Sequence, residues 1–192
     1  MAKRPNTSEE ILRCARSLIV AGGYNGFSYA DIAKVVGIRN ASIHHYFPSK
    51  TDLVRALVAG YREDVDAGIA EMERRIADPV EQLRAYTGYW EACIADASDP
   101  FCVCALLAGE IPVLPQEVAL EVRAHFRRLS AWLASVLERG ASQGGLRLSG
   151  TARDEAETFM AGIHGAMLSA RAYADPQVFG IVARRLLERL VV

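Results

Sequence analysis

The chain has 192 residues, of which 51% are hydrophobic, and its formal net charge is −1. This length allows one good core or a small module joined to a larger one, and the apolar content excludes a disordered chain. The apolar runs are far shorter than the roughly 20 residues that span a bilayer, and the N-terminus has no apolar signal core. We therefore expect a cytoplasmic protein with no membrane segment.

The charge is unevenly distributed along the chain. Residues 1–60 contain eight Lys and Arg against four Asp and Glu, a net charge of +4, whereas residues 61–192 carry a net charge of −5. All three lysines lie in the first part, at Lys3, Lys34 and Lys50. A small basic end on an acidic body predicts that the basic end contacts a polyanion.

The whole chain is predicted to be helical, because no segment shows sustained alternation of β-branched residues and no Asn-Gly hairpin joins apolar runs. A hydroxyl followed three residues later by an acid predicts helix N-caps at Thr7, Ser28 and Ser49. The predicted helices cover residues 8–21, 29–36, 40–46, 50–76, 79–96, 101–109, 116–140, 152–173 and 176–190. A proline at a first helical position marks the start of three of these helices, those over 79–96, 116–140 and 176–190. These prolines are Pro79, Pro115 and Pro176.

The second and third predicted helices are the most informative segment. Gly37 separates them and tolerates the left-handed backbone that a bihelical corner needs. Ile32 and Ile43 are expected to share a small core with the first helix. The side chains left to project can reach base edges and phosphates in a major groove. They are Arg39, Asn40, Ala41, Ser42, His44 and His45.

The segment Ile11–Leu57 resembles the DNA-binding domain of the tetracycline-repressor (TetR) family, and the stretch GIRNASIHHYFPSKTDL resembles the family's signature almost position for position. The resemblance combines the turn, an aromatic pair, a proline and a capped following helix. The matching residues are Ala33, Gly37, Ile38, Ser42, Ile43, His45, Tyr46, Phe47, Ser49, Lys50 and Leu53.

The resemblance implies an all-α fold with two domains. Residues 1–49 would form a three-helix helix-turn-helix DNA-binding domain, and residues 50–192 a helical ligand-sensing and dimerisation domain, with the fourth helix bridging them. It also implies residues that lie at the groove and others that hold phosphates or orient the recognition helix on double-stranded operator DNA. The implied DNA-binding residues are Ser28, Tyr29, Arg39, Asn40, Ala41, Ser42, His44, His45, Tyr46 and Lys50.

Residues 61–192 show no pattern that is typical of an enzyme. The segment has no P-loop, GxGxxG or paired-acid pattern, so no catalytic residue is assigned and no cofactor is expected. No spacing of cysteine and histidine resembles a zinc site, so no metal is expected either. The four cysteines are expected to be thiols in a reducing cytoplasm.

Aromatic and sulfur side chains gather on the middle helices, and most of them are expected in the core. The sensor domain of the resembled family holds a ligand cavity between helices, so some of these side chains are expected to line an apolar pocket for a small-molecule inducer. The predicted ligand-binding residues are Tyr86, Trp90, Cys93, Cys102, Phe126, Phe159 and His164.

The segment Cys102–Glu110, followed by Leu114 and Pro115, resembles one branch of the family that includes repressors of electrophile-detoxifying reductases. Cys102 falls on the branch cysteine and lies near a predicted helix start, where a thiolate is favoured. A thiol-based electrophile or redox sensor triggered through Cys102 is therefore the alternative to a plain ligand cavity. Against it, cysteines are commonly buried and inert, and no lysine follows Lys50 to favour a thiolate.

The last two predicted helices have apolar faces that predict a homodimer through an isologous four-helix interface. The alternative is that these faces pack only within their own subunit. The predicted interface residues are Phe159, Gly162, Ile163, Ala166, Met167, Phe179, Val182, Leu186 and Leu190.

Together these features predict a ligand-responsive transcriptional repressor that binds a palindromic operator as a homodimer and is released by a small-molecule inducer. Two other classes stay open. One is a binding module whose helix-turn-helix has lost specific DNA recognition, and the other is a small helical enzyme, for which the sequence offers no candidate residues. Retardation of DNA by the purified protein separates the first class from these two.

Overall fold

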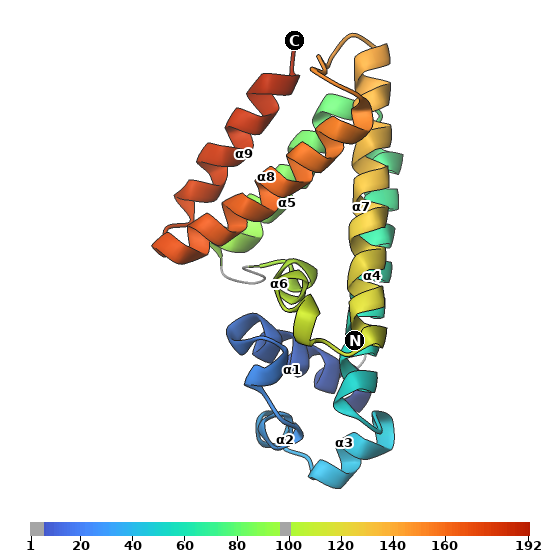
Figure 1. The fold of residues 1–192 in the computed structure, drawn as a ribbon, viewed down its shortest axis with the longest axis vertical. Helices are drawn as coiled ribbons and strands as arrows, with labels where there is room; N and C mark the ends of the chain where they lie inside the picture. Colours follow the sequence, from blue (N-terminus) through green and yellow to red (C-terminus); the bar gives the residue numbers. More distant parts are fainter. Residues whose placement is uncertain (1–5, 97–100) are drawn as a thin grey trace. The chain divides into compact units, whose positions relative to one another are not determined.

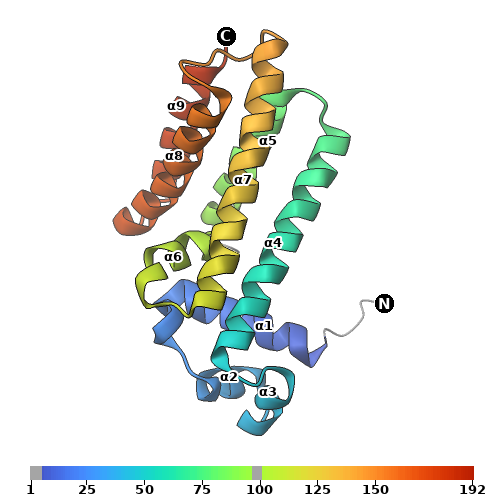
Figure 2. The same cartoon turned by 45° about the vertical axis from the view of Figure 1, so that its right-hand side comes forward.

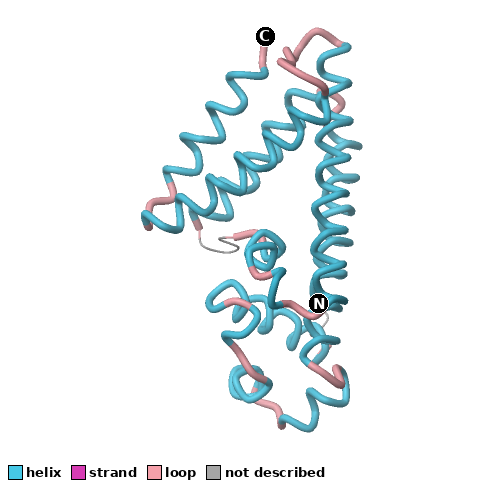
Figure 3. Tube along the Cα trace, viewed as in Figure 1, coloured by secondary structure: helices cyan, strands magenta, loops and turns pink. Residues whose placement is uncertain are grey.

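The computed structural model describes residues 6–96 and 101–192, and these residues are almost entirely helical (Figure 3). Within this described part no β-strand forms, and the β-type pairing is an isolated antiparallel bridge between Leu146 and Val191. The all-α prediction is confirmed. No helix in the same residues is long and apolar enough to cross a membrane.

The predicted helix ranges differ from the observed ones by at most two residues at either end, and two short 3-10 turns were not predicted because three residues carry no periodic signal. Figure 1 shows the elements in chain order. They are α1 (Thr7–Gly22), η1 (Tyr24–Gly26), α2 (Tyr29–Val36), α3 (Asn40–Tyr46), α4 (Lys50–Arg75), α5 (Pro79–Ala95), α6 (Val103–Gly109), η2 (Ile111–Val113), α7 (Gln116–Ser142), α8 (Ala152–Tyr173) and α9 (Gln177–Leu190).

Helix starts follow the predicted capping chemistry, with one correction. The caps at Ser28 and Ser49 are confirmed: Ser28 forms a capping box with Asp31, and the Ser49 hydroxyl accepts the backbone N–H of Asp52 at 3.1 Å. The expected cap at Thr7 is wrong by one residue: Asn6 caps α1, and the Glu9 side chain closes the capping box. Asparagine is among the best N-caps and outranks threonine, and the Asn6–Glu9 pair keeps the spacing of three that the box needs.

Proline marks the helix starts less uniformly than predicted. Pro79 is the first residue of α5, where the Asp78 carboxylate caps the helix. Pro115 and Pro176 instead lie one residue before the first residues of α7 and α9, so both predictions were wrong by one position. A proline fits at either place because neither needs a backbone N–H.

The described residues form two compact units, and the predicted domain boundary after residue 49 stays a prediction. Unit 1 contains the chain up to Asp64 together with Val103–His125, and unit 2 contains Val65–Cys102 and Phe126–Val192. Helices α4 and α7 each run without a break from one unit into the other.

Unit 1 groups α1, α2, α3 and the first turns of α4, as Figure 2 shows, and α6 packs against α1. We call α1–α3 the headpiece. Branched aliphatic side chains form its core because they recur on one face of each helix. The fully buried members of this core are Ile11, Ile19, Ile32 and Ile43, and Leu53 at the start of α4 is fully buried as well.

Unit 2 is built around the long pair α8 and α9, which lie side by side (Figure 1). Phe159 of α8 and Phe179 of α9 are buried at its core. Gly162 allows the two helices to approach closely, because a Cβ at this position would come within 2.6 Å of a Leu186 methyl group. Helix α9 also packs against α5.

A polar network joins three helices of unit 2. The Glu73 carboxylate of α4 accepts from the Trp132 indole N–H at 3.2 Å and from the Arg139 guanidinium at 3.1 Å, both on α7. Arg139 also donates to the side-chain oxygen of Gln82 on α5 at 2.7 Å. Gln82 is buried and donates in turn to the backbone oxygen of Ile76. The network satisfies polar groups where these helices cross.

Candidate DNA-binding interface and sensor residues

The corner between α2 and α3 depends on Gly37. It adopts φ 76° and ψ 31°, the left-handed conformation that few side chains tolerate, and its N–H donates to the Ala33 carbonyl. The N–H of Ile38 also bonds Ala33, at 3.1 Å, and α3 then starts after Arg39. This closure is the local structure that the sequence predicted for a helix-turn-helix.

Tyr29 fastens the end of α3 to the start of α2. Its hydroxyl donates to the backbone oxygen of Phe47 at 2.9 Å, and its ring lies 4.7 Å from the ring of His44, measured between centroids. Burial raises the pKa of Tyr29 to about 12, and the nearby Asp52 carboxylate adds to the effect. The neutral phenol therefore acts as a structural hydrogen-bond donor, which agrees with an orienting role more than with a direct phosphate contact.

The outward face of α3 and its N-cap is polar and exposed. His44 is held on this face because its Nδ1 lies 3.2 Å from the Pro48 carbonyl oxygen. Ser42 is half-buried and Ile43 points into the core. The exposed residues are Arg39, Asn40, Ala41, His44, His45 and Tyr46. The structure thus presents on one short helix most of the residues predicted to read DNA.

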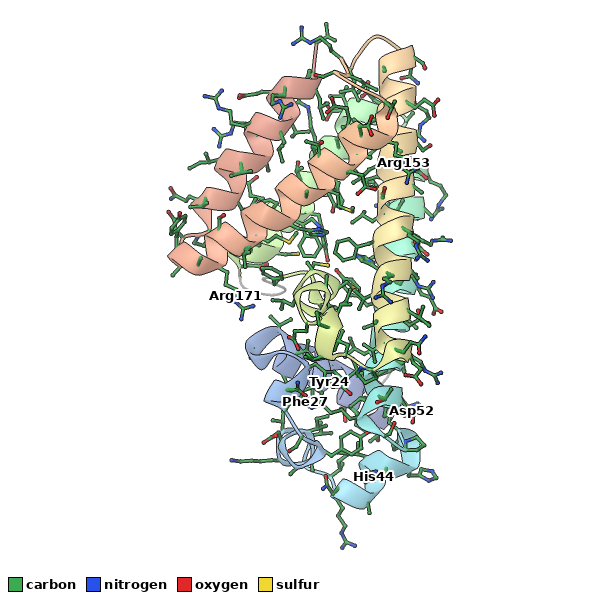
Figure 4. All side chains as sticks on the ribbon, in the orientation of Figure 1. Tyr24, Phe27, His44, Asp52, Arg153 and Arg171 are labelled. Atoms are coloured by element: carbon green, nitrogen blue, oxygen red, sulfur yellow. The ribbon has the colours of Figure 1, made fainter. Side chains whose placement is uncertain are left out.

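Ser28 and Lys50, predicted to hold phosphates, have partners within the protein. The Ser28 hydroxyl donates to Asp31, and this hydrogen bond lowers the pKa of the Asp31 carboxyl. The Lys50 ammonium donates to the Phe27 carbonyl and lies 4.1 Å from the Phe27 ring centroid and 4.9 Å from that of Tyr24. Figure 4 shows Tyr24 and Phe27 close together. Burial lowers the pKa of Lys50, against the opposing effect of the Asp31 and Glu110 carboxylates.

All seven predicted ligand-binding residues belong to unit 2, and none is fully exposed. The rings of Phe126 and His164 lie 5.1 Å apart, and Tyr86 packs against Trp132 at 5.4 Å. Burial and an interaction with Cys102 raise the pKa of Tyr86. A pocket in unit 2 lies away from these ring pairs, between the start of α8 and the end of α9. Of the seven predicted ligand-binding residues, Phe159 lines this pocket.

Two family models match the chain. One, described as bacterial regulatory proteins of the tetR family, matches residues 11–57, and the other, described as tetracyclin repressor-like C-terminal domain, matches residues 79–186. The chain belongs to the tetR family of bacterial regulatory proteins. As a TetR-family protein it is a DNA-binding transcriptional regulator and not an enzyme, as the sequence predicted.

The chain is also similar to solved structures and to curated relatives. A TetR-family transcriptional regulator from Agrobacterium tumefaciens is 67% identical, with a TM-score of 0.95 over 97% of this chain and 98% of that one. A nucleoid occlusion factor SlmA from Marinobacter nauticus is 25% identical over 85% of this chain and 83% of its own length. An HTH-type transcriptional repressor KstR2 from Rhodococcus jostii is 29% identical over 72% and 67%, respectively.

The TetR-family regulator buries most of its predicted dimer residues within a single subunit. Of the nine, Gly162, Val182 and Leu186 are half-buried. The other six are less than 5% exposed: Phe159, Ile163, Ala166, Met167, Phe179 and Leu190. Both α8 and α9 are apolar on more than one side. The periodicity of apolar residues therefore pointed to the face that packs inside unit 2, and this is the face from which the dimer residues were predicted. Their large exposed apolar side chains are Leu168, Tyr173 and Ile181.

One carboxylate that contacts the headpiece, that of Glu110, was not predicted from the sequence to have a role. Glu110, between α6 and η2, accepts the backbone N–H of Tyr24 at 2.9 Å. The two residues are 86 positions apart, so no local pattern links them. Among the residues that the structure describes, no group of three His, Cys, Asp or Glu could hold a metal ion.

Proposed function

We propose that this regulator is a cytoplasmic, ligand-responsive repressor. It binds a palindromic operator as a homodimer and is released by a small-molecule inducer. The observation that carries the proposal is the exposed polar face of α3, held by the Tyr29–Phe47 hydrogen bond and the Gly37 corner. A short helix with a rigid base and free polar side chains has the form of a major-groove recognition helix.

The groove contacts that we propose come from the N-terminal end of α3. Arg39 and Asn40 are exposed and lie at its first positions, and the small side chain of Ala41 allows a close approach. Arg and Asn are the side chains that pair in bidentate fashion with guanine and adenine. His44 and His45 lie one turn further along, where a base edge or a phosphate is within reach.

Selection of duplexes from a random pool by the purified full-length protein tests the proposal. The expected product is a palindrome with half-sites about one helical turn apart, because a two-fold dimer presents two recognition helices. Arg39→Ala should weaken binding to the selected duplex by at least tenfold. Arg153→Ala, an exposed arginine of unit 2 labelled in Figure 4, is the matched control and should bind as the wild type does. Recovery of no enriched sequence contradicts the proposal.

The dimer that we propose uses the exposed side of α8 and α9. Leu168 and Ile181 are 58% and 59% exposed in one protomer, and exposed apolar side chains on neighbouring helices are typical of an association surface. Two such helices from each subunit would form a four-helix contact. Leu168→Arg should yield a folded monomer in analytical ultracentrifugation, whereas Tyr89→Arg, at an exposed tyrosine of α5, should stay dimeric. A monomeric wild type at micromolar concentration removes the dimer from the proposal.

The inducer that we propose is a small, largely apolar molecule that binds among the aromatic side chains of unit 2, with Trp90, Phe126 and His164 as contacts. Helices α4 and α7 continue from unit 2 into unit 1, so a change at either helix in one unit reaches the other through an unbroken backbone. Release then requires that the inducer bind the DNA-free state more tightly. By linkage, the selected duplex must weaken inducer binding by the same factor, which a titration with and without the duplex measures.

A second candidate makes the trigger covalent. Cys102 is the residue directly before α6, interacts with Tyr86, and is 1% exposed, so a modified thiol there would disturb packing. N-ethylmaleimide should release the selected duplex from the wild type, and from Cys14→Ser and Cys93→Ser, but not from Cys102→Ser. If Cys102→Ser responds to the reagent as the wild type does, the thiol trigger is wrong and the cavity version stands.

A further inference from the structure

The Glu110 carboxylate lies against the turn that leads into α2. One oxygen accepts the backbone N–H of Tyr24 at 2.9 Å, and the other faces Gly23 so closely that a Cβ there would overlap it. All three residues belong to unit 1. A hydrogen bond from a backbone amide to a carboxylate is charge-assisted and is stronger than a bond between neutral groups.

Gly23 makes this approach possible. It ends α1 with φ 76° and ψ −176°, a backbone conformation that is essentially restricted to glycine, and its N–H donates to the Ile19 carbonyl at 2.8 Å. Because glycine has no side chain, the Glu110 carboxylate can reach the backbone of Gly23 and Tyr24. Gly23 therefore terminates α1 and also leaves space for the carboxylate of Glu110, a residue from a distant part of the chain.

Lys50 contacts the same turn. Its ammonium contacts the rings of Tyr24 and Phe27 and donates to the Phe27 carbonyl, and Glu110 is one of the two carboxylates that act on it. The α2–α3 pair occupies residues 29–46, so Tyr24 and Phe27 precede the pair and Lys50 follows it. Glu110 and Lys50 thus hold together the two ends of the segment that contains the recognition helix.

We propose that Glu110 is a positioning residue for operator binding, which fixes the orientation of α2 and α3 through Tyr24 and Lys50 without contacting DNA. This inference rests on the proposed function of the headpiece. It predicts a change in DNA affinity that differs in sign from the simple effect of removing a negative charge. Loss of a carboxylate near a DNA-binding surface reduces repulsion from phosphates and by itself strengthens binding to any duplex. Loss of a positioning group weakens binding to the operator alone.

The test compares Glu110→Ala, Glu110→Gln and the control Glu117→Gln, which removes the same charge from an exposed position at the start of α7. Fluorescence anisotropy with the full-length proteins measures Kd for the duplex selected by the wild type and for a scrambled duplex of equal length. We expect Glu110→Ala to raise Kd for the selected duplex about tenfold, the loss of one charge-assisted hydrogen bond, with the scrambled duplex bound no more weakly than before. Glu110→Gln should fall between, because its amide oxygen can still accept from Tyr24.

Hydrogen exchange at the Tyr24 amide supplies the readout that general destabilisation does not give: exchange should accelerate at Tyr24 while the headpiece core at Ile43 keeps its protection. Equal weakening of the selected and scrambled duplexes, or a folded Glu110→Ala that binds the selected duplex as Glu117→Gln does, overturns the inference. If Glu110→Ala does not fold, Glu110→Gln decides by the same two criteria. If the wild type selects no sequence, the proposed function itself is contradicted. If the wild type selects a sequence but Glu110→Ala binds it as Glu117→Gln does, only the inference about Glu110 is contradicted.

Discussion

Units 1 and 2 fix their structures by different means. In unit 1, side chains bond the backbone of the headpiece: Tyr29 to the Phe47 carbonyl, Lys50 to the Phe27 carbonyl, and Glu110 to the Tyr24 amide. In unit 2, large apolar side chains such as Phe159 and Phe179 fill the space between helices. A headpiece of three helices, of which α2 has eight residues and α3 has seven, has little volume for a core, so hydrogen bonds to its backbone add to the rigidity that burial supplies in unit 2.

This difference suits the two proposed tasks. A recognition helix must hold its exposed side chains in register with base edges, and directional bonds to the backbone preserve that register. A site for an apolar ligand instead needs a wall of aromatic and aliphatic side chains with few polar groups. The variants below test whether burial dominates in unit 2 and directional contacts dominate in unit 1.

The largest effect should come from the core of unit 2. Phe159 is 2% exposed, so Phe159→Ala should lower the free energy of unfolding by about 3–5 kcal/mol, the usual cost of truncating a buried phenylalanine. Urea unfolding followed by circular dichroism measures it. Leu168→Ala, on the exposed side of the same helix, should stay within about 0.5 kcal/mol when both variants are compared in an Ile181→Arg background, which we expect to be monomeric because Ile181 lies on the proposed dimer surface. An unchanged midpoint for Phe159→Ala would mean that this ring lines an open cavity.

The next effect separates two glycines of the headpiece. Gly23→Ala should cost about 2–3 kcal/mol or more, because its backbone conformation is essentially restricted to glycine and the new Cβ meets the Glu110 carboxylate. Gly37→Ala should cost about 1 kcal/mol, since its left-handed conformation is strained for alanine but the surrounding space is open. Adding Glu110→Ala to Gly23→Ala should recover part of the loss. Equal costs for the two glycine variants would remove the proposed close contact.

The sequence predicted the local features of the fold well because each had a short-range cause. The capping box at Ser28, the hydroxyl cap at Ser49 and the left-handed corner at Gly37 are each set by residues within four positions. The correction at Asn6 has the same origin, since Asn6 and Thr7 both suit a cap and each is followed three residues later by a glutamate, and α1 uses the Asn6–Glu9 pair. The exposed face of α3 followed from the same local pattern.

Long-range placement was not predictable in the same way. Glu110 reaches Tyr24 across 86 positions, and nothing in the sequence near either residue marks the pair. The apolar faces of α8 and α9 posed a related problem, because periodicity identifies a face that is buried but not the element that buries it. The residues predicted for the dimer, Ile163 and Met167 among them, therefore turned out to be core, while Leu168 and Ile181 are exposed.

A third prediction concerns base preference. A carbonyl oxygen only accepts hydrogen bonds, so the contact with Pro48 places the hydrogen of the neutral His44 ring on Nδ1 and leaves Nε2 as an acceptor. We expect Nε2 to accept from the amino group of an adenine or cytosine in each half-site. His44→Gln, which offers both a donor and an acceptor, should reduce discrimination at that base pair by about 1–3 kcal/mol.

Repeating the duplex selection with His44→Gln and with the control His45→Gln measures this change. His45 is also exposed but packs edge-to-face on the Tyr46 ring, so its variant should keep the preference at the position that His44 reads. Identical selected sequences from both variants and the wild type would remove His44 from base recognition.

The smallest effect tests the hydrogen bond that fastens α3. Tyr29→Phe removes only the hydroxyl that donates to Phe47, and it should lower the free energy of unfolding by about 0.5–1.5 kcal/mol at neutral pH. Tyr46→Phe, which alters an exposed ring on α3, is the matched control and should have no measurable effect on stability. A loss of that size for Tyr29 would show that a single directional bond matters in a headpiece with so small a core.

The pH dependence of the same variant gives an independent check. Folding raises the pKa of Tyr29 from its ordinary value near 10 to about 12, so the folded state binds the phenolic proton more tightly than the unfolded chain does. The resulting stability is fully present below pH 10 and is lost as the pH rises through 12. Burial also raises the pKa of Tyr86, so the wild type carries two such contributions. Chemical unfolding at pH 9 and at pH 11 should therefore show the gap between the wild type and Tyr29→Phe narrowing at the higher pH, while Tyr46→Phe follows the wild type at both. A gap that stays constant would place the Tyr29 hydroxyl in solvent and leave α3 held by apolar packing.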